Sequence, residues 1–438
     1  MICNHFLTRA QSLQPSCHTT IAVRARQTWR TPTALIEHKH NYGLNRPEYL
    51  GVRQLSMQHT ARIQKNNIKL RANGFQSLLK LLYSSLKAHS IFFALIAVYV
   101  AGAIWATTFV GDNVNYKLPP SSFAAPFIVY LLPILLLAIV TMRFGRLALY
   151  VKPKHPISAL VKDLKEFLSS SPRLANGLPI LIAMIVFIHY FTFVKASLPA
   201  IAPFSWDTTF MEWDKWLHFG MHPWQILQPI LGYPIVTFAI NVIYHLWFII
   251  MWMIWCWLAF AVKNSPLRMQ FFLSFMLIWM IGGSLFAISL SSAGPVYYSA
   301  IGLSPNPYAD LLTYLQEANN SFPIWALDVH KALWDGYTGK LDKFIGISAM
   351  PSLHNATALL FAFVGWRTNR TAGIALTIFA GFILIGSVHL AWHYAIDAYL
   401  GFIIAGVIWL FSGWFARWYL KTPVNASYAK ALAAHETK

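Results

Sequence analysis

The chain has 438 residues, of which 57% are hydrophobic and only 11% are charged. This composition excludes an ordinary water-soluble protein and predicts an all-α, polytopic integral membrane protein whose main surroundings are the bilayer. A formal net charge of +19 would indicate nucleic-acid binding in a soluble chain. The lysines and arginines here gather in the N-terminal segment and in particular loops, so we interpret them as markers of membrane topology and expect no nucleic-acid partner.

Residues 1–89 are rich in Arg, Lys, Gln, Asn and Thr, with Glu37 and Glu48 as their only acids. We interpret this segment as a mostly disordered, basic tail, whose amphipathic end at residues 75–89 is suited to lie on the membrane surface. Two alternatives are an organellar transit peptide and an over-extended start with Met57 as the true initiator.

Eight apolar runs follow the tail, and each is long enough, or nearly so, to cross a bilayer core that requires roughly 20 helical residues. They predict about eight transmembrane helices, of which the sixth is the shortest. The runs are residues 90–111, 125–144, 178–198, 234–262, 269–291, 352–366, 372–390 and 397–416.

The charges of the loops indicate the orientation, because basic loops stay on the cytoplasmic side of a membrane. Lys and Arg follow every even-numbered run, whereas the long connections at 199–233 and 292–351 mix acids with bases. We therefore expect both termini in the cytoplasm and the two long connections on the opposite side. We expect a bacterial inner membrane with these connections in the periplasm; an internal membrane of a eukaryotic cell is the alternative.

Two short segments place ionisable side chains beside apolar runs, where a charge without a function is expensive. They are residues 348–354 (SAMPSLH) and 389–397 (HLAWHYAID). His393 and Asp397 are four residues apart, so on a helix the carboxylate can bond one imidazole nitrogen and leave the other free to attack. His354 can protonate a departing oxygen. Ser352 suits a helix start, where backbone N–H groups favour anions. Phosphate is therefore the expected substrate group.

Each of these features also has a purely structural interpretation. A His–Asp pair at this spacing can be a helix cap, and isolated membrane histidines usually pack in the core. Core packing is the expectation for His189, His245, His330 and His389, although His189 and His245 lie in different runs and a haem-binding pair is an alternative. Cys3, Cys17 and Cys256 are too scattered for a disulfide framework, and the sequence contains no nucleotide loop or Cys/His metal cluster.

Residues 350–354 (MPSLH), followed by residues 393–397 (HYAID) and Gly401, resemble the type 2 phosphatidic acid phosphatase superfamily, specifically its inositol phosphorylceramide synthase-like branch. A weaker resemblance extends over residues 178–416. It includes Trp206-Asp207 and the segments 212–220 (EWDKWLHFG), 244–248 (YHLWF) and 294–298 (GPVYY).

This resemblance implies a six-helix core, here within residues 151–420, preceded by two additional helices within 90–150 and followed by a cytoplasmic tail at 421–438. It also implies a phosphohistidine reaction that uses no metal or other cofactor. His393 would be the nucleophile, Asp397 would orient it, and His354 would protonate the leaving group.

The sequence departs from the superfamily at its basic positions. Gly386-Ser387 stand where Ser-Arg is often found, and residues 294–298 stand in place of a motif with Lys and Arg-Pro. Another cation must therefore hold the phosphate, and Lys195 is the preferred candidate over Lys331, Lys340 and Lys343, with an interfacial snorkelling role as its alternative. Tyr297 and Tyr298 are candidate phosphate donors or members of an aromatic belt.

The leading hypothesis is a membrane phosphatase that hydrolyses a lipid phosphate or diphosphate at the outer face of the membrane. The branch resemblance favours a second function, transfer of a phosphoryl-alcohol headgroup to an acceptor such as inositol. The rivals from other classes are a haem-binding electron carrier and a non-catalytic transporter or scaffold.

Overall fold

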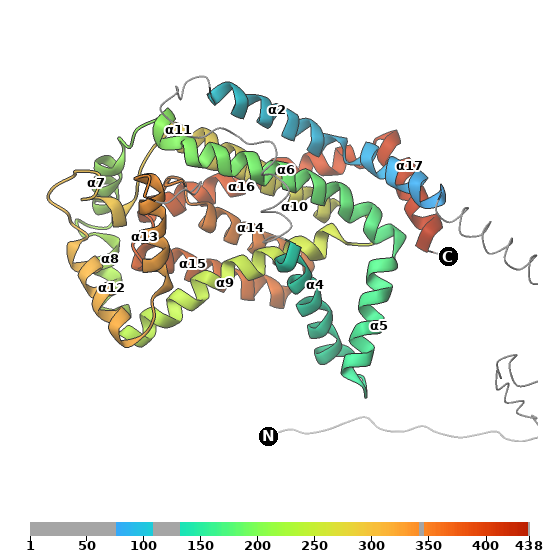
Figure 1. The fold of residues 1–438 in the computed structure, drawn as a ribbon, viewed down its shortest axis with the longest axis horizontal. Helices are drawn as coiled ribbons and strands as arrows, with labels where there is room; N and C mark the ends of the chain where they lie inside the picture. The colour runs from blue at the N-terminus through green and yellow to red at the C-terminus, as the bar shows by residue number, and fades with distance from the viewer. Residues whose placement is uncertain (1–75, 108–131, 341–345, 437–438) are drawn as a thin grey trace, which may run out of the picture. The chain divides into compact units, whose positions relative to one another are not determined.

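The computed structural model describes residues 76–107, 132–340 and 346–436. These residues are almost entirely helical and contain no β-strand, which confirms the all-α class (Figure 1). The helices after Gln76–Ala88 are α2 (Ser90–Thr107), α4 (Leu132–Arg146) with π-helical η4 (Leu147–Val151), α5 (Pro156–Ser169), α6 (Ser171–Ile201), α7 (Asp207–Leu217), α8 (Pro223–Leu231), α9 (Pro234–Ala259), α10 (Pro266–Leu277) with π-helical η5 (Ile278–Phe286) and α11 (Ala287–Ser289), the 3₁₀ turn η6 (Pro295–Tyr297), α12 (Ala309–Ser321), α13 (Trp325–Tyr337), α14 (Leu353–Thr368), α15 (Arg370–His389), α16 (Ala395–Tyr419) and α17 (Pro423–Glu436).

Six helices in the described residues are long and apolar enough to cross a membrane, which confirms a polytopic membrane protein. A seventh span results if Gln76–Ala88 and Ser90–Ala106, which meet at 55°, count as one. The expected number was eight. With the bent pair counted as one span, the remaining difference lies in α14, whose 16 residues extend about 24 Å at 1.5 Å per residue, short of a core of about 30 Å.

The centre of the bundle is formed by α14, α15 and α16, with α10 packed on α16 and α9 packed on α15 (Figure 1). Small residues let these helices approach closely. A Cβ atom on Gly401 would lie 2.8 Å from the carbonyl oxygen of Ser352, so only glycine lets α16 pass so near the start of α14. This contact explains why Gly401 belongs to the sequence motif.

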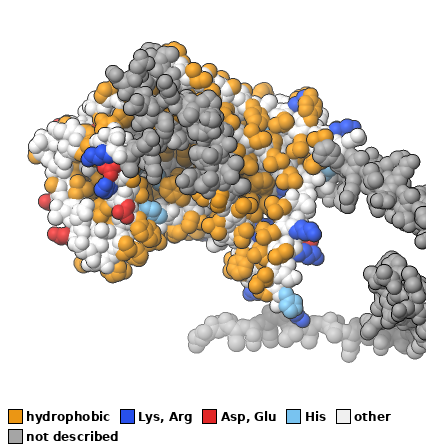
Figure 2. All heavy atoms as spheres, viewed as in Figure 1, with side chains coloured by type: hydrophobic (Ala, Val, Ile, Leu, Met, Phe, Trp, Pro, Cys, Tyr) orange, Lys and Arg blue, Asp and Glu red, His pale blue; other side chains and the backbone are white. Residues whose placement is uncertain are grey.

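The two long connections predicted at 199–233 and 292–351 contain short helices and not extended loops. Helices α7, α8, α12 and α13 lie together at one end of the bundle (Figure 1). Figure 2 shows that acidic side chains gather mainly at this same end, as the loop charges indicated. The side of the membrane to which it faces stays a prediction, and so do the proposed domain boundaries; most of the tail lies outside the described residues.

A fully buried arginine holds the opposite end together. The guanidinium of Arg268 donates to the carbonyl oxygens of Leu258 (3.0 Å) and Asn176 (2.7 Å), and it contacts Nε2 of His89 at 2.8 Å. Leu258 lies in the last turn of α9, where carbonyl groups have no partner within the helix and a positive charge is favourable. Arg268 is one of the basic residues that follow the fourth apolar run and indicate topology. In the structure it also joins α6, α9, α10 and the helix pair at the N-terminal end.

We predict that the Arg268→Ala variant unfolds at a markedly lower temperature than the wild type. Removing the guanidinium leaves several buried carbonyl groups unpaired, and each such group costs on the order of 1–3 kcal/mol. Thermal denaturation of the purified protein in detergent measures the effect. Arg417→Ala, which removes an exposed arginine near the end of α16, serves as the matched control. Equal midpoints for both variants would contradict a structural role for Arg268.

Candidate active site

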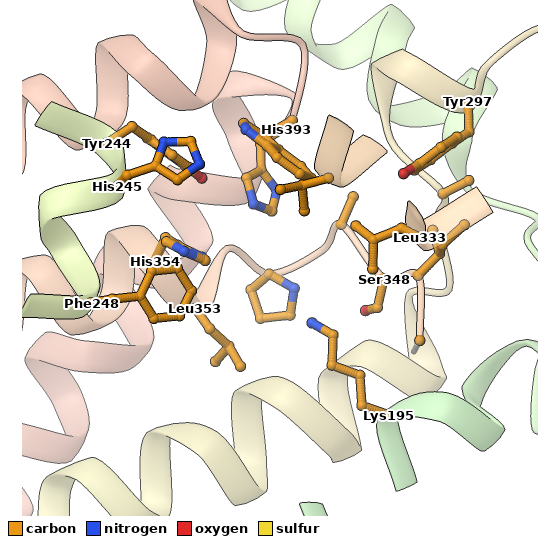
Figure 3. A pocket seen from close by; sticks show the side chains of 17 residues that line it. Lys195, Tyr244, His245, Phe248, Tyr297, Leu333, Ser348, Leu353, His354 and His393 are labelled. Atoms are coloured by element: carbon orange, nitrogen blue, oxygen red, sulfur yellow. The ribbon is translucent and has the colours of Figure 1, made fainter. Parts of the chain in front are cut away.

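A cavity of about 340 Å³ lies where α6, α9, α14 and the loop before α16 meet. Lys195 of α6, His245 of α9, His354 of α14 and His393 of the loop all line it. Figure 3 shows these side chains around one shared space. Most of the remaining lining residues are apolar or aromatic, so charges inside the cavity interact across a medium of low polarity.

His393 and Asp397 form the pair that their spacing predicted. The distance between Nδ1 of His393 and Oδ2 of Asp397 is 3.1 Å, and the same carboxylate oxygen accepts the backbone N–H of Tyr394 at 3.1 Å. Asp397 is fully buried and His393 is 9% exposed. An imidazole that donates its Nδ1–H to a carboxylate keeps the lone pair on Nε2, so this arrangement can present a nucleophile.

His354 begins α14 and is surrounded by aromatic rings of α9. Its ring is nearly parallel to that of Tyr244, with centroids 5.1 Å apart, and 4.1 Å from the ring of Trp247. Trp247 also donates its indole N–H to the His354 carbonyl oxygen at 3.1 Å. His354 interacts electrostatically with both His393 and Lys195. The segment 244–248 therefore forms the wall that orients His354.

The three segments 291–298, 348–354 and 387–397 are joined by backbone hydrogen bonds. Ser352 N–H donates to the Asp397 carbonyl oxygen at 3.0 Å, and Ala349 N–H donates to the Ser292 carbonyl oxygen at 2.9 Å. Gly294 has a φ of +99°, and a Cβ there would lie 2.9 Å from the Trp392 carbonyl oxygen. The motifs that carry His354 and His393 are thus held against each other and against the segment 294–298.

Comparison with protein families agrees with this geometry. Residues 208–411 match the family model of the PAP2 superfamily. This region is a PAP2 superfamily domain. The match confirms the resemblance at the level of the superfamily, and it includes His354, His393 and Asp397. Searches of the curated proteins and of the solved structures give no match.

Two buried carboxylates hold the loop that carries His393 in place. Asp214 accepts the N–H groups of Ala395 (2.7 Å) and Ile396 (2.9 Å), which are the first residues of α16. Asp207, just before the domain, accepts the N–H of Gly294 at 2.8 Å and the hydroxyl of Tyr394 at 2.8 Å. Sequence reasoning assigned these acids no site role, although they lie in aromatic segments that resemble the family, which was the available signal.

Lys195 lies outside the region that matches the PAP2 superfamily, yet it is the only Lys or Arg among the described lining residues of the cavity. Gly346 lets the chain approach it, because a Cβ there would lie 2.0 Å from the Lys195 carbonyl oxygen. Of the other candidate cations, Lys331 forms an ion pair with Asp335 at 2.5 Å, and neither Lys331 nor Lys340 lines the cavity. Lys343 lies outside the described residues.

Of the three remaining candidates for phosphate binding, Tyr297, Tyr298 and Ser352, the first alone lines the cavity. Tyr297 lines the cavity, but its hydroxyl donates to the His330 carbonyl oxygen at 2.9 Å. Tyr298 is buried and packs on Tyr308, away from the lining. Ser352 is buried as well, and its hydroxyl caps α14 by accepting from Asn355. The structure therefore gives Ser352 and Tyr298 structural contacts and does not bring them into the cavity.

Among the four histidines expected to pack in the core, His245 differs from the others because it lines the cavity. Its Nδ1 donates to the Asn241 carbonyl oxygen at 2.7 Å, which leaves Nε2 as a hydrogen-bond acceptor. His330 is buried against Trp392, with ring centroids 4.0 Å apart, and His389 bonds Thr237 at 2.9 Å. His189, the other half of the haem alternative, is not a lining residue.

Burial changes the acid–base behaviour of the groups beside the cavity. Desolvation, and to a smaller extent the positive charge of Lys195, lower the pKa of His393 to about 3, although a hydrogen bond with the Ala349 backbone raises it. His393 is therefore neutral at physiological pH, as a nucleophile must be. Desolvation raises the pKa of Asp214 to about 7, although its bonds to the Ala395 and Ile396 backbone lower it.

We predict a pH-dependent stability difference between the wild type and Asp214→Asn. Because burial raises the pKa of Asp214 from 3.8 to about 7, the folded protein binds more protons than the unfolded protein between these values. The contribution of Asp214 to stability therefore falls as pH rises through this window. The midpoint of Asp214→Asn should rise relative to the wild type between pH 5 and pH 8, as measured by thermal denaturation.

Glu212→Gln is the control for this experiment, because Glu212 is exposed on the same helix. Its midpoint relative to the wild type should stay constant over the same pH range. A constant offset for Asp214→Asn as well would show that the Asp214 carboxyl does not titrate in this window.

Proposed function

We propose that the PAP2 domain is a membrane lipid phosphatase that hydrolyses a lipid phosphate or diphosphate through a phosphohistidine intermediate on His393. The observation that carries this proposal is the 3.1 Å contact between His393 and Asp397 in a cavity that also contains His354 and Lys195. An oriented neutral imidazole, a second imidazole and an ammonium group are the parts that displacement at phosphorus requires.

In the first step, Nε2 of His393 attacks the phosphorus atom while the bond from phosphorus to the lipid oxygen breaks. His354, in its protonated form, gives its proton to that oxygen, so the lipid leaves as an alcohol, or as a monophosphate if the substrate is a diphosphate. The Asp397 carboxylate stabilises the positive charge that develops on the His393 ring. The buried position of Asp397 makes this interaction stronger than it would be in water.

In the second step, water attacks the phosphorus atom of the phosphohistidine. His354, now neutral, takes a proton from the water, and the bond between phosphorus and His393 breaks to release inorganic phosphate. Lys195 provides the positive charge that offsets the phosphate oxygens in both steps, in place of the basic residues absent from the superfamily positions. Residues 386 and 387, which stand at one of those positions, are Gly and Ser.

Headgroup transfer, as in the inositol phosphorylceramide synthase-like branch, is the second candidate, and one observation favours it. Lys195 is the single cation among the described lining residues. A phosphodiester carries one negative charge, whereas a phosphomonoester carries close to two at pH 7. A single ammonium balances the diester better. In this reaction an alcohol takes the place of water in the second step, and the Nε2 acceptor of His245 can bind its hydroxyl.

The site then faces the outer, periplasmic side of a bacterial inner membrane, because Lys and Arg follow every even-numbered apolar run and basic loops stay in the cytoplasm. A haem-binding role and a non-catalytic role are the remaining alternatives. A Soret band in the purified protein would support the former.

We predict that His393→Ala, His354→Ala and Asp397→Ala each lower phosphate release from phosphatidic acid or a polyprenyl diphosphate by at least roughly 100-fold, since positioned acid–base groups contribute this much or more. The assay uses detergent-purified protein in the presence of EDTA. His155→Ala, which changes an exposed histidine before α5, is the control and should keep wild-type activity. Undiminished activity in the three variants would remove these residues from the chemistry.

Lys195→Met should lower kcat/KM by about 10²–10³-fold, the effect of losing one donor that stabilises the transition state. Lys195→Arg should retain a larger share of the activity because it keeps the charge. Equal losses in both variants would indicate that Lys195 acts through packing. Wild-type protein that releases no phosphate, but passes the headgroup of a phosphatidyl lipid to an added alcohol, would establish transfer as the reaction.

A further inference from the structure

The end of α7 presents a group of large apolar side chains that the proposed reaction does not use. This aromatic platform consists of Trp213, Trp216, Leu217, Phe219 and Met221, and all five are exposed. Phe219 is 96% exposed and Trp216 is 77% exposed. The opposite face of α7 is buried and carries Asp207, Phe210 and Asp214. The exposed side of the helix thus carries Trp213, Trp216 and Leu217 together with the charged Glu212 and Lys215, and its large apolar side chains are turned away from the protein.

The backbone at Phe219 makes its exposure more unusual. Phe219 has a φ of +59°, in the left-handed region that favours glycine, at the point where α7 ends. The N–H of Gly220 donates back to the Lys215 carbonyl oxygen at 2.8 Å, which closes the end of the helix. A residue with a side chain adopts this conformation only at an energetic cost, because its Cβ comes close to the following carbonyl oxygen. In water, a phenyl group with almost no protein contact would offer nothing to offset this cost.

The position of the platform along the bundle is fixed by α16. Nε2 of His218 contacts the hydroxyl of Tyr399 at 2.9 Å, and the two rings are stacked. Tyr399 is the fifth residue of the candidate span Ala395–Tyr419, so it lies about 6 Å along the helix from the start of that span. A residue beside Tyr399 therefore lies at the level where the span enters the bilayer.

The platform is also continuous with the exposed apolar surface of α16. From Tyr399 this surface continues through Ile403, Val407 and Leu410, which are all exposed and share one face of the helix. A span must turn such a face to lipid. Trp and Phe on an amphipathic helix are typical of residues that enter the boundary between headgroups and acyl chains.

We propose that α7 and residues 217–221 lie in the lipid–water boundary, with Trp213, Trp216 and Phe219 inserted among the lipids. The partner of this surface is the bilayer that surrounds the protein. Because Asp214 of the same helix holds the start of α16, the bilayer in this way supports the loop that carries His393. The proposal concerns α7 alone and does not depend on the reaction that the cavity performs.

The test uses the full chain in liposomes, with Cys3, Cys17 and Cys256 replaced by serine or alanine and one spin label attached to a new cysteine. The labelled positions are Phe219→Cys and Trp216→Cys, with Met221→Cys as a third in case one of them does not fold. Leu410→Cys, in the middle of α16, is the lipid control, and Asn320→Cys, exposed on α12, is the control for the same end of the protein. Power saturation compares collisions with oxygen, which enters lipid, and with a water-soluble nickel chelate.

The expected result is a ratio of oxygen to nickel accessibility at positions 216 and 219 that lies between those of the two controls and is clearly above that of position 320. A ratio equal to that of position 320 would place the platform in water and overturn the proposal. Low accessibility to both reagents, or spin–spin broadening between labels, would overturn it in favour of coverage by protein or by a second copy of the chain.

Discussion

The N-terminal N–H groups of α16 are bound by carboxylates, and the geometry of the site depends on this constraint. Helix starts leave several donors without partners, which is costly at the edge of a membrane. Here Asp397 accepts the N–H of Tyr394, and Asp214 accepts those of Ala395 and Ile396. Asp207 binds the hydroxyl of Tyr394 from the other side. The helix start, and with it His393, therefore has one position.

Hydrogen bonds and close contacts of this kind also hold ionisable side chains in a cavity whose lining is mostly apolar or aromatic. Each functional side chain comes from a different helix or loop, but their backbones are joined by short hydrogen bonds and by glycine contacts. The rings of Tyr244 and Trp247 pack against His354 and fix its orientation. Preorganised groups in a site of low polarity need little rearrangement during reaction, and this is the main source of electrostatic catalysis.

Much of the fold followed from the sequence, because hydrophobic runs and loop charges are strong signals in membrane proteins. The runs predicted helices that the structure contains, and residues 350–354 and 393–397 predicted the PAP2 superfamily. The run at residues 352–366 predicted a span, but α14 has 16 residues and is too short to cross a core that needs about 20. The His393–Asp397 contact was predictable because four-residue spacing on a helix is a local property.

Long-range contacts were not predictable in this way. Apart from the aromatic segments around them, nothing local distinguishes Asp207 and Asp214 from ordinary loop acids, since their partners lie about 90 and 180 residues further along the chain. Ser352 looked like an anion-binding residue, but its hydroxyl is used within its own helix start. The structural role of Arg268 was hidden as well, because its partners Asn176 and Leu258 belong to other helices.

The cavity contains a residue, Lys195, that lies outside the region that matches the superfamily. The only cation among the described lining residues comes from α6, and Asp207 also precedes residue 208, where the match to the superfamily begins. A fragment cut at the borders of that match would retain His354 and His393 but lose Lys195, the cation that we propose to compensate the charge of the substrate. The unit that forms the complete cavity is thus larger than the segment that matches the superfamily, and it includes α6.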